Sequence, residues 1–170
     1  AAYNHMIKKV NTPYIAFTHA DCVVDKNWLK ILISSFEDGV VAVGGITKTP
    51  KDVNKLQILI GRELEERYHN FPRFVSRLPL MNLCVKTSVA KKISFNENLV
   101  VAQETDWGYK LTRIGKMLYN SRAIVWHYHR ATLAGFLKQQ YNYGKFVPQV
   151  YLNKENFGKI KGDHISLPTM

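Results

Sequence analysis

The sequence predicts an α/β fold, because short apolar runs of strand length alternate with longer segments of helical periodicity. The run from Tyr14 to Phe17 ends abruptly in the polar residues His19 and Asp21, as a buried parallel strand does at its carboxyl end. A second apolar run covers residues 39–46 and contains the pair Gly44–Gly45. In open α/β sheets, ligands bind in the crevice outside the carboxyl ends of the strands, so we expect the functional site there.

The other elements follow from periodicity and from capping residues. Helical patterns cover residues 1–10, 25–36, 51–69, 87–93, 104–114 and 132–147, and further apolar runs predict strands at residues 80–86, 117–119 and 123–126. Asp25 or Asn27 is the expected N-cap of the second helix, and Gly115 is the expected end of the fifth. Because the chain opens with a helix directly before its most buried strand, we expect N-terminal strands of the sheet to be missing.

Length and composition are those of one folded domain, which we place at residues 1–147. The chain has 170 residues, of which 46% are hydrophobic and 12% aromatic. Residues 148–170 are polar and lysine-bearing, and we expect a loose C-terminal extension there. Cys22 and Cys84 lack the spacing of a metal-binding pair and predict a reducing compartment or buried thiols. With no apolar run of membrane-spanning length, we expect a cytoplasmic protein, peripheral at most to the inner face of the membrane.

The net charge of +11 favours polyanionic partners, which include nucleic acid, anionic lipid and phosphorylated small molecules. No arginine-rich tract accompanies this charge, so specific nucleic-acid binding is not expected. A solvated basic surface explains the same charge without any partner.

Three polar groups stand where strands end or helices begin. His19 and Asp21 lie two residues apart on one side of an extended chain, where both can bind a metal, although Asp21 can equally cap a turn. Glu104 and Asp106 open a helix, where carboxylates stabilise the N-terminus or serve as a general base. His127 ends a strand and is either a structural residue or the completion of a metal site with Asp21.

Together these segments resemble the family 2 glycosyltransferases, which are inverting enzymes with a nucleotide-sugar-binding GT-A fold. The segments that carry the resemblance are Phe17–Asp21 with Asn27–Leu29 (the family's Asp-x-Asp strand end and Trp-Leu helix), Gly44–Gly45, Asn82–Glu97, Gln103–Lys110 (its Glu-Asp-x-Asp-Leu-x-x-Arg motif) and Val125–Arg130 (its late Val-x-His-x-His/Arg). His19 departs from the pattern by standing where the family has the first acid.

The resemblance implies a GT-A α/β/α sandwich with a mixed, mostly parallel sheet that lacks its N-terminal nucleotide-binding strands. It also implies a hexosyltransferase-type enzyme of glycan or polysaccharide biosynthesis. Such an enzyme moves a sugar from a UDP- or GDP-linked donor to a glycan or lipid-linked acceptor, with inversion and with Mn²⁺ or Mg²⁺. An anionic membrane surface is a further expected partner.

The same resemblance implies roles for individual residues. Asp21, His127 and His19 would hold the metal, and two histidines favour Mn²⁺ over Mg²⁺. Glu104 falls on the position of the catalytic base, with Asp106 as the other candidate. The donor would be contacted by His19, Asp21, Gly45 and Arg130, while Trp107 would shape the sugar pocket.

Two other functions compete with this hypothesis. A non-catalytic basic α/β module that binds an anionic membrane surface or nucleic acid agrees with the net charge and with the amphipathic segment 132–147. A metal-dependent hydrolase agrees with the same His and Asp ligands, but it requires a richer cluster of ligands than the sequence offers.

Overall fold

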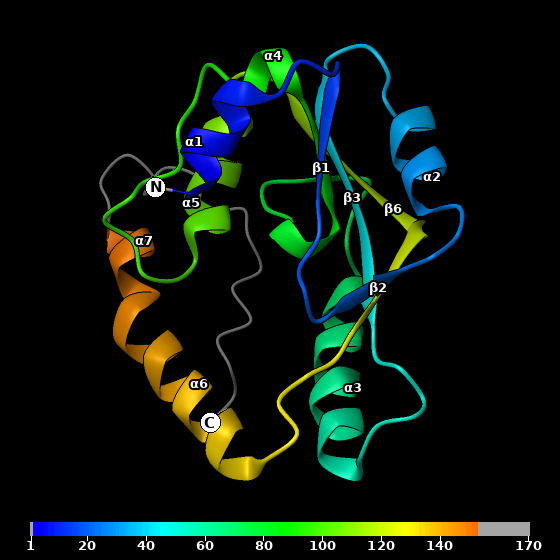
Figure 1. The fold of residues 1–170 in the computed structure, drawn as a ribbon, viewed down its shortest axis with the longest axis vertical. Coiled ribbons are helices and arrows are strands. Elements are labelled where there is room, and N and C mark those ends of the chain that lie inside the picture. The colour runs from blue at the N-terminus through cyan, green and yellow to red at the C-terminus, as the bar shows by residue number, and fades with distance from the viewer. Residues whose placement is uncertain (1, 153–170) are drawn as a thin grey trace.

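The structure is a computed structural model that describes residues 2–152 (Figure 1). Its elements, in chain order, are α1 (Ala2–Lys9), β1 (Tyr14–Phe17), β2 (Cys22–Val24), α2 (Trp28–Ser34), β3 (Val40–Lys48), α3 (Lys55–His69), β4 (Phe74–Val75), the 3₁₀ turn η1 (Leu80–Asn82), β5 (Leu83–Lys86), α4 (Thr87–Ala90), α5 (Gln103–Leu111), β6 (Lys116–His127), α6 (Leu133–Phe146) and α7 (Pro148–Leu152). Helices and strands alternate along the chain, so the α/β class is confirmed.

The strands form one mixed sheet of six strands in the order β1-β5-β3-β6-β2, with β4 also paired to β6. The mixed character is as expected, but among the strands of residues 2–152 only β3 and β6 pair in parallel, and the other pairs are antiparallel. The expectation of a mostly parallel sheet was therefore wrong. A strand buried on both faces is apolar whichever way its neighbour runs, so an apolar run does not determine strand direction.

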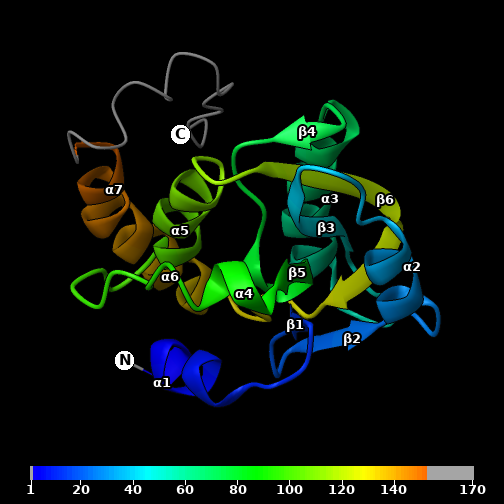
Figure 2. The ribbon, with the colours of Figure 1, turned by 90° about the horizontal axis from the view of Figure 1, so that it is seen from above.

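Helices cover both faces of the sheet and enclose two apolar clusters. On one face Trp28 and Leu32 of α2 pack against Val43, Cys84 and other side chains of the central strands. On the opposite face Trp107 and Leu111 of α5 belong to a larger cluster with Phe17, Leu83 and Val85. Both ribbon views show α2 and α5 on opposite sides of the strands (Figures 1 and 2). This layering is the α/β/α sandwich that the sequence predicted.

Gly44 and Gly45 lie inside β3 and not at its end, because the strand continues to Lys48. A Cβ on Gly45 would overlap the carbonyl oxygen of Ala123, and a Cβ on Gly44 would crowd the carbonyl oxygen of Asn82. Close packing of backbone against backbone thus accounts for the glycine pair. The strand expected at residues 39–46 thus extends two residues further, to Lys48, and the predicted contact of Gly45 with a donor stays a prediction.

The C-terminal third differs from expectation in two places. The two short strands expected around Leu118 and Val125 are one strand, β6, whose register against β3 shifts between Gly45 and Ile46. Residues 148–152 form α7, whose Val150 is buried against Leu99 and Tyr109. The packed chain therefore extends past residue 147, while the rest of the predicted loose extension lies outside the described residues.

Candidate active site

The site forms where β1 ends and the chain turns back into β2. The amide of Cys22 donates to the carbonyl oxygen of His19 at 3.2 Å, which closes the turn. β2 then pairs antiparallel with the end of β6, so that Cys22 lies opposite His127. The amide of Tyr128 extends this pairing by donating to the carbonyl oxygen of Asp21 at 2.9 Å. Sheet formation thus brings residues 21 and 127 together.

Asp21, Cys22 and His127 present one ligand atom each within 4.8 Å of one another. Asp21 Oδ2 lies 3.4 Å from His127 Nε2, and the Cys22 thiol donates to Asp21 Oδ1 at 3.7 Å. Metal bonds of about 2.1 Å at angles of about 90–110° place two ligands of one ion roughly 3.0–3.5 Å apart. The spacing of Asp21 and His127 therefore fits two ligands of a single cation.

The state of His127 also suits a metal ligand. Burial lowers the pKa of its imidazole, while the Asp21 carboxylate acts in the opposite direction. A neutral imidazole is the form that binds metals. Its Nδ1 is buried and has no hydrogen-bond partner among the described residues.

His129 packs against His127 and is itself fixed by hydrogen bonds. The two rings meet edge to face with centroids 4.6 Å apart. The Nε2 of His129 forms a hydrogen bond of 3.2 Å with Thr49 Oγ1, and its carbonyl oxygen accepts from Gln57 Nε2 at 2.8 Å. Burial, aided by the neighbouring His127, lowers the pKa of His129 to about 4. His129 therefore stays neutral near pH 7 and fixes the end of β6 to α3.

Glu104 lies in the first turn of α5, which follows the left-handed residue Ala102 (φ 58°). Burial raises the pKa of the Glu104 carboxyl, while His19 and Arg77 lower it. The Glu104 carboxyl therefore interacts electrostatically with His19. A carboxyl of raised pKa beside a candidate metal site is a suitable general base.

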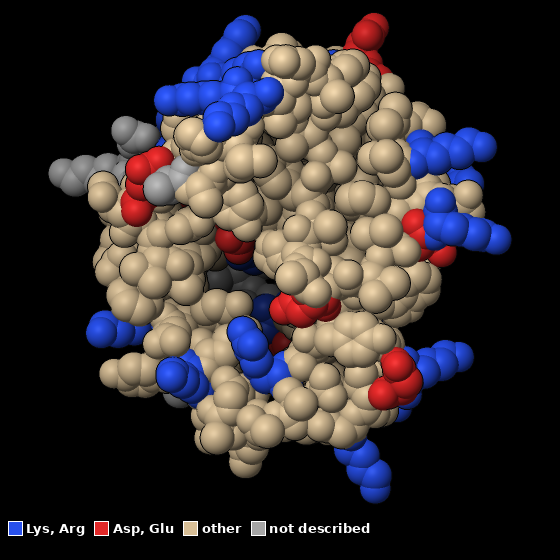
Figure 3. All heavy atoms as spheres, viewed as in Figure 1, with Lys and Arg blue, Asp and Glu red and all other residues tan. Residues whose placement is uncertain are grey.

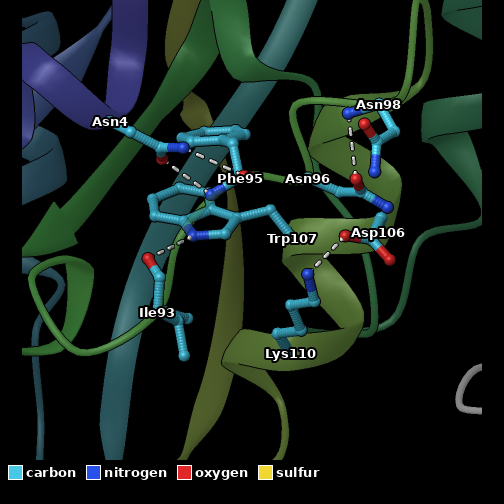
Figure 4. Close-up of polar contacts among 8 residues, drawn as sticks. All are labelled: Asn4, Ile93, Phe95, Asn96, Asn98, Asp106, Trp107 and Lys110. Atoms are coloured by element: carbon cyan, nitrogen blue, oxygen red, sulfur yellow. Dashed lines mark hydrogen bonds and ion pairs between the residues drawn. The ribbon is translucent and has the colours of Figure 1, made fainter. Parts of the chain in front are cut away.

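Asp106, the other predicted base, faces a different environment. Its side chain is 1% exposed and lies 2.8 Å from Lys110 Nζ in an i,i+4 ion pair (Figure 4). Trp107, the predicted pocket residue, is fully buried and stacks on Phe95 with ring centroids 4.3 Å apart. Asp106 is thus paired with a lysine of its own helix, and Trp107 packs into the core and does not shape a sugar pocket. Glu104 is therefore the better candidate base.

The charged groups of the candidate site interact electrostatically with one another. The charges of Asp21, His19 and Arg130 act on His127, and those of Glu104, Arg130 and Asp21 act on the phenol of Tyr143 in α6. The space-filling view shows a hollow between the α5–α6 side and the sheet, with acidic and basic atoms on its rim (Figure 3). Arg130 is exposed and available to an anionic ligand.

Sequence reasoning missed two members of this site. Cys22 was read as a reduced thiol, because its role depends on the pairing of β2 with β6. Tyr143 was not singled out within the amphipathic segment 132–147, because nothing local in the sequence shows that its phenol interacts with Glu104 and Asp21. His19, by contrast, was predicted as a ligand but is not in the group formed by Asp21, Cys22 and His127. Gly45 is buried within β3.

Comparison with known families gives one match. The model described as Glycosyl transferase family 2 matches residues 1–99, which is more than half of the chain. The matched part contains His19, Asp21 and Gly45, whereas Glu104, His127 and Arg130 follow it. A search among curated proteins gives no match.

Proposed function

Because the chain belongs to glycosyl transferase family 2, and so to the glycosyltransferases, we propose a specific reaction for the cleft around Asp21, His127 and Glu104. A hexosyl group moves from a nucleotide-diphospho-sugar to an acceptor hydroxyl of a glycan or a lipid-linked saccharide, with inversion of the anomeric carbon. The observation that carries the proposal is the 3.4 Å approach of Asp21 to His127, together with the half-buried carboxyl of Glu104, whose pKa is raised by desolvation and which interacts electrostatically with His19.

Asp21 and His127 would hold the divalent cation, with Cys22 or His19 beside them. Mn²⁺ is preferred to Mg²⁺, because imidazole suits transition metals better than it suits Mg²⁺. The cation supplies Lewis-acid stabilisation of the charge that develops on the departing nucleoside diphosphate. Arg130, exposed at the end of β6, contributes a positive charge to the same phosphates.

Glu104 accepts the proton of the acceptor hydroxyl. The acceptor oxygen forms a bond to the anomeric carbon from the face opposite the leaving group. The bond from that carbon to the phosphate oxygen breaks, and its electron pair leaves with the nucleoside diphosphate. A single displacement of this kind inverts the anomeric centre, and the proton stays on the Glu104 carboxyl until the product departs.

Thermal unfolding with UDP- and GDP-sugars, with and without Mn²⁺, tests the proposal. One nucleotide class should raise the melting temperature only when Mn²⁺ is present. At ligand concentrations about 100-fold above Kd, the stabilisation of about 2.7 kcal/mol corresponds to a rise of roughly 5–10 °C. Asp21→Ala should abolish the rise, and Asp52→Ala, at an exposed acid, should retain it. A rise that is equal without Mn²⁺, or that survives in Asp21→Ala, contradicts the proposed site.

A second function, attachment to an anionic membrane surface, is favoured by α6. None of its residues is buried, and Leu133, Leu137 and Tyr141 recur at helical spacing with 58%, 56% and 70% of each residue exposed. The helix carries Lys138 and Lys145 and no acidic residue. An apolar stripe with flanking lysines is typical of interfacial helices. No helix among the described residues has the length and hydropathy to cross a bilayer.

Vesicle sedimentation tests this attachment. The chain should bind phosphatidylcholine vesicles that contain phosphatidylglycerol and should not bind pure phosphatidylcholine. The double variant Leu137→Ser, Tyr141→Ser should lose most of the binding, while Leu59→Ser, at an equally exposed residue of α3, should retain it. Equal binding by all three proteins would assign the effect to net charge alone. A cytoplasmic location at the inner face of the membrane is part of this second proposal.

A further inference from the structure

A second hollow, which shares no lining residue with the Asp21–His127 site, lies between the ends of α2 and α3. We call it the aromatic groove and define it by six of its lining residues, Phe36, Lys48, Tyr68, Phe71, Tyr119 and Ser121. Its volume of about 770 Å³ falls within the range of roughly 300–1,000 Å³ that is typical of small-molecule sites. The register shift of β6 near residue 120 places Tyr119 and Ser121 in this groove.

Aromatic rings form one part of the groove. Tyr119 stacks on Tyr68 with centroids 6.2 Å apart and meets Phe71 edge to face at 5.4 Å. Tyr68 and Phe71 are themselves 5.1 Å apart, so the three rings support one another. Burial raises the pKa of Tyr119 to about 12, so its hydroxyl remains a hydrogen-bond donor at physiological pH. Such a cluster offers flat apolar faces with hydroxyl groups at their edges.

One cation gives the groove its charge. Arg73 and Glu37, which also line it, neutralise each other at 2.6 Å. Lys48, half-buried at the end of β3, has no ion pair among the residues that the structure describes. Ser121 is exposed and adds a hydroxyl. Lys48 is therefore free to bind an anionic group beside the aromatic faces.

We propose that the aromatic groove binds a sugar unit that bears one anionic group, either a carboxylate or a phosphate. The apolar face of a sugar ring packs on the aromatic side chains, its hydroxyls exchange hydrogen bonds with Tyr119 and Ser121, and its anion pairs with Lys48. No neutral or purely inorganic ligand uses all three features.

The position of Tyr68 connects the groove to the cleft. Tyr68 lines the groove, and the charges of Arg77 and Glu104 act on its phenol. Tyr68 therefore interacts electrostatically with the residue proposed as the catalytic base. If the proposed transferase function holds, on which this step rests, the bound unit belongs to the acceptor glycan and makes that acceptor anionic.

Titration calorimetry without Mn²⁺ or donor tests the groove alone. The probes are D-glucuronate, D-glucose 6-phosphate, D-glucose and inorganic phosphate. We expect one or both anionic sugars to bind at least tenfold more tightly than glucose and inorganic phosphate, and the tighter one identifies the anion. Lys48→Met should weaken this binding at least tenfold. Lys26→Met, at an exposed lysine outside the groove, should leave it unchanged.

A second variant keeps the test decisive if Lys48→Met fails to fold. Ser121→Trp places a large side chain at an exposed groove position and should also block binding, while the melting temperature stays near that of the parent chain. Binding that survives both substitutions, or anionic sugars that bind no better than glucose, overturns the proposal. Because no donor or Mn²⁺ is present, failure here leaves the transferase test unaffected, and failure of that test leaves this binding measurement intact.

Discussion

Replacement of Asn82 by leucine should destabilise the chain strongly, because this one side chain joins three elements. Asn82 is fully buried, accepts from Trp28 Nε1 of α2 at 2.8 Å, and donates to the carbonyl oxygens of Ile46 and Ala123 at 2.9 Å each. The last two carbonyls flank the register shift between β3 and β6. Asn82 therefore holds the part of β6 that leads to His127.

The magnitude follows from the groups that lose a partner. Asn82→Leu keeps the number and branching of the heavy atoms but leaves one indole N–H and two carbonyl oxygens without this contact. Each unsatisfied buried group costs about 1–3 kcal/mol, and carbonyls keep part of their bonding, so we expect a loss of about 3–6 kcal/mol. That is a large share of a total stability of about 5–15 kcal/mol. Trp28→Phe breaks only the indole bond and should cost about 1–3 kcal/mol.

Urea denaturation followed by circular dichroism measures these losses. Asn27→Leu is the control, since the Asn27 side chain makes no capping hydrogen bond and should change stability by no more than about 0.5 kcal/mol. In the double variant of Trp28 and Asn82 the two losses should not add, because both include the same bond. Strict additivity, or a cost below about 1 kcal/mol for Asn82→Leu, would refute the reasoning.

Three further predictions concern the site and its packing. Glu104→Gln should lower the rate of sugar transfer about 10²–10⁴-fold and leave donor affinity unchanged. Near-normal turnover in this variant, or an equal loss in the control Glu66→Gln at an exposed residue, would show that Glu104 is not the base. Burial raises the pKa of Glu104, and the base must be ionised to accept a proton, so kcat/KM should fall as the pH is lowered. This fall should occur at a higher pH than it would for an exposed glutamate. A fall within the ordinary pKa range of glutamate would contradict a buried base. Gly45→Ala should cost about 1–3 kcal/mol through overlap with Ala123, whereas Gly144→Ala, with open space around it, should stabilise α6 slightly; equal effects would contradict the packing.

The predictable part of the fold came from patterns that are local in sequence. The positions of the strand at Tyr14–Phe17 and of the helix expected at residues 51–69 were predicted correctly, because strands and helices leave their own local patterns. The expectation of a buried parallel strand at Tyr14–Phe17 was wrong, because β1 lies at the edge of the described sheet, pairs antiparallel with β5 and buries only Phe17. The strand β2 was missed, since Cys22–Val24 is only three residues long and exists through its pairing with β6, about a hundred residues away. Strand direction escaped prediction for the same reason.

The candidate site, like the fold, was predictable only where the signal is local in sequence. Asp21, His127 and Glu104 were predicted as site residues because each stands at the end of a strand or the start of a helix, where polar residues follow apolar ones. Their mutual distances depend on the sheet order, which no local pattern contains. Cys22 and Tyr143 could not be found, because each looks like an ordinary buried thiol or helix-face residue until the tertiary pairing is known. Trp107 was misassigned since an aromatic side chain at a site and one in a core look alike in sequence.

Binding of Mn²⁺, measured as loss of the free-ion signal in electron paramagnetic resonance, tests whether Asp21 and His127 hold one cation. We expect one ion per chain in the presence of the nucleoside diphosphate that stabilises the protein. Asp21→Ala and His127→Ala should each lose this ion, and Asp52→Ala should keep it, because Asp21 Oδ2 and His127 Nε2 lie 3.4 Å apart as ligands of one cation. Mn²⁺ binding that is undiminished in Asp21→Ala and His127→Ala would contradict the account.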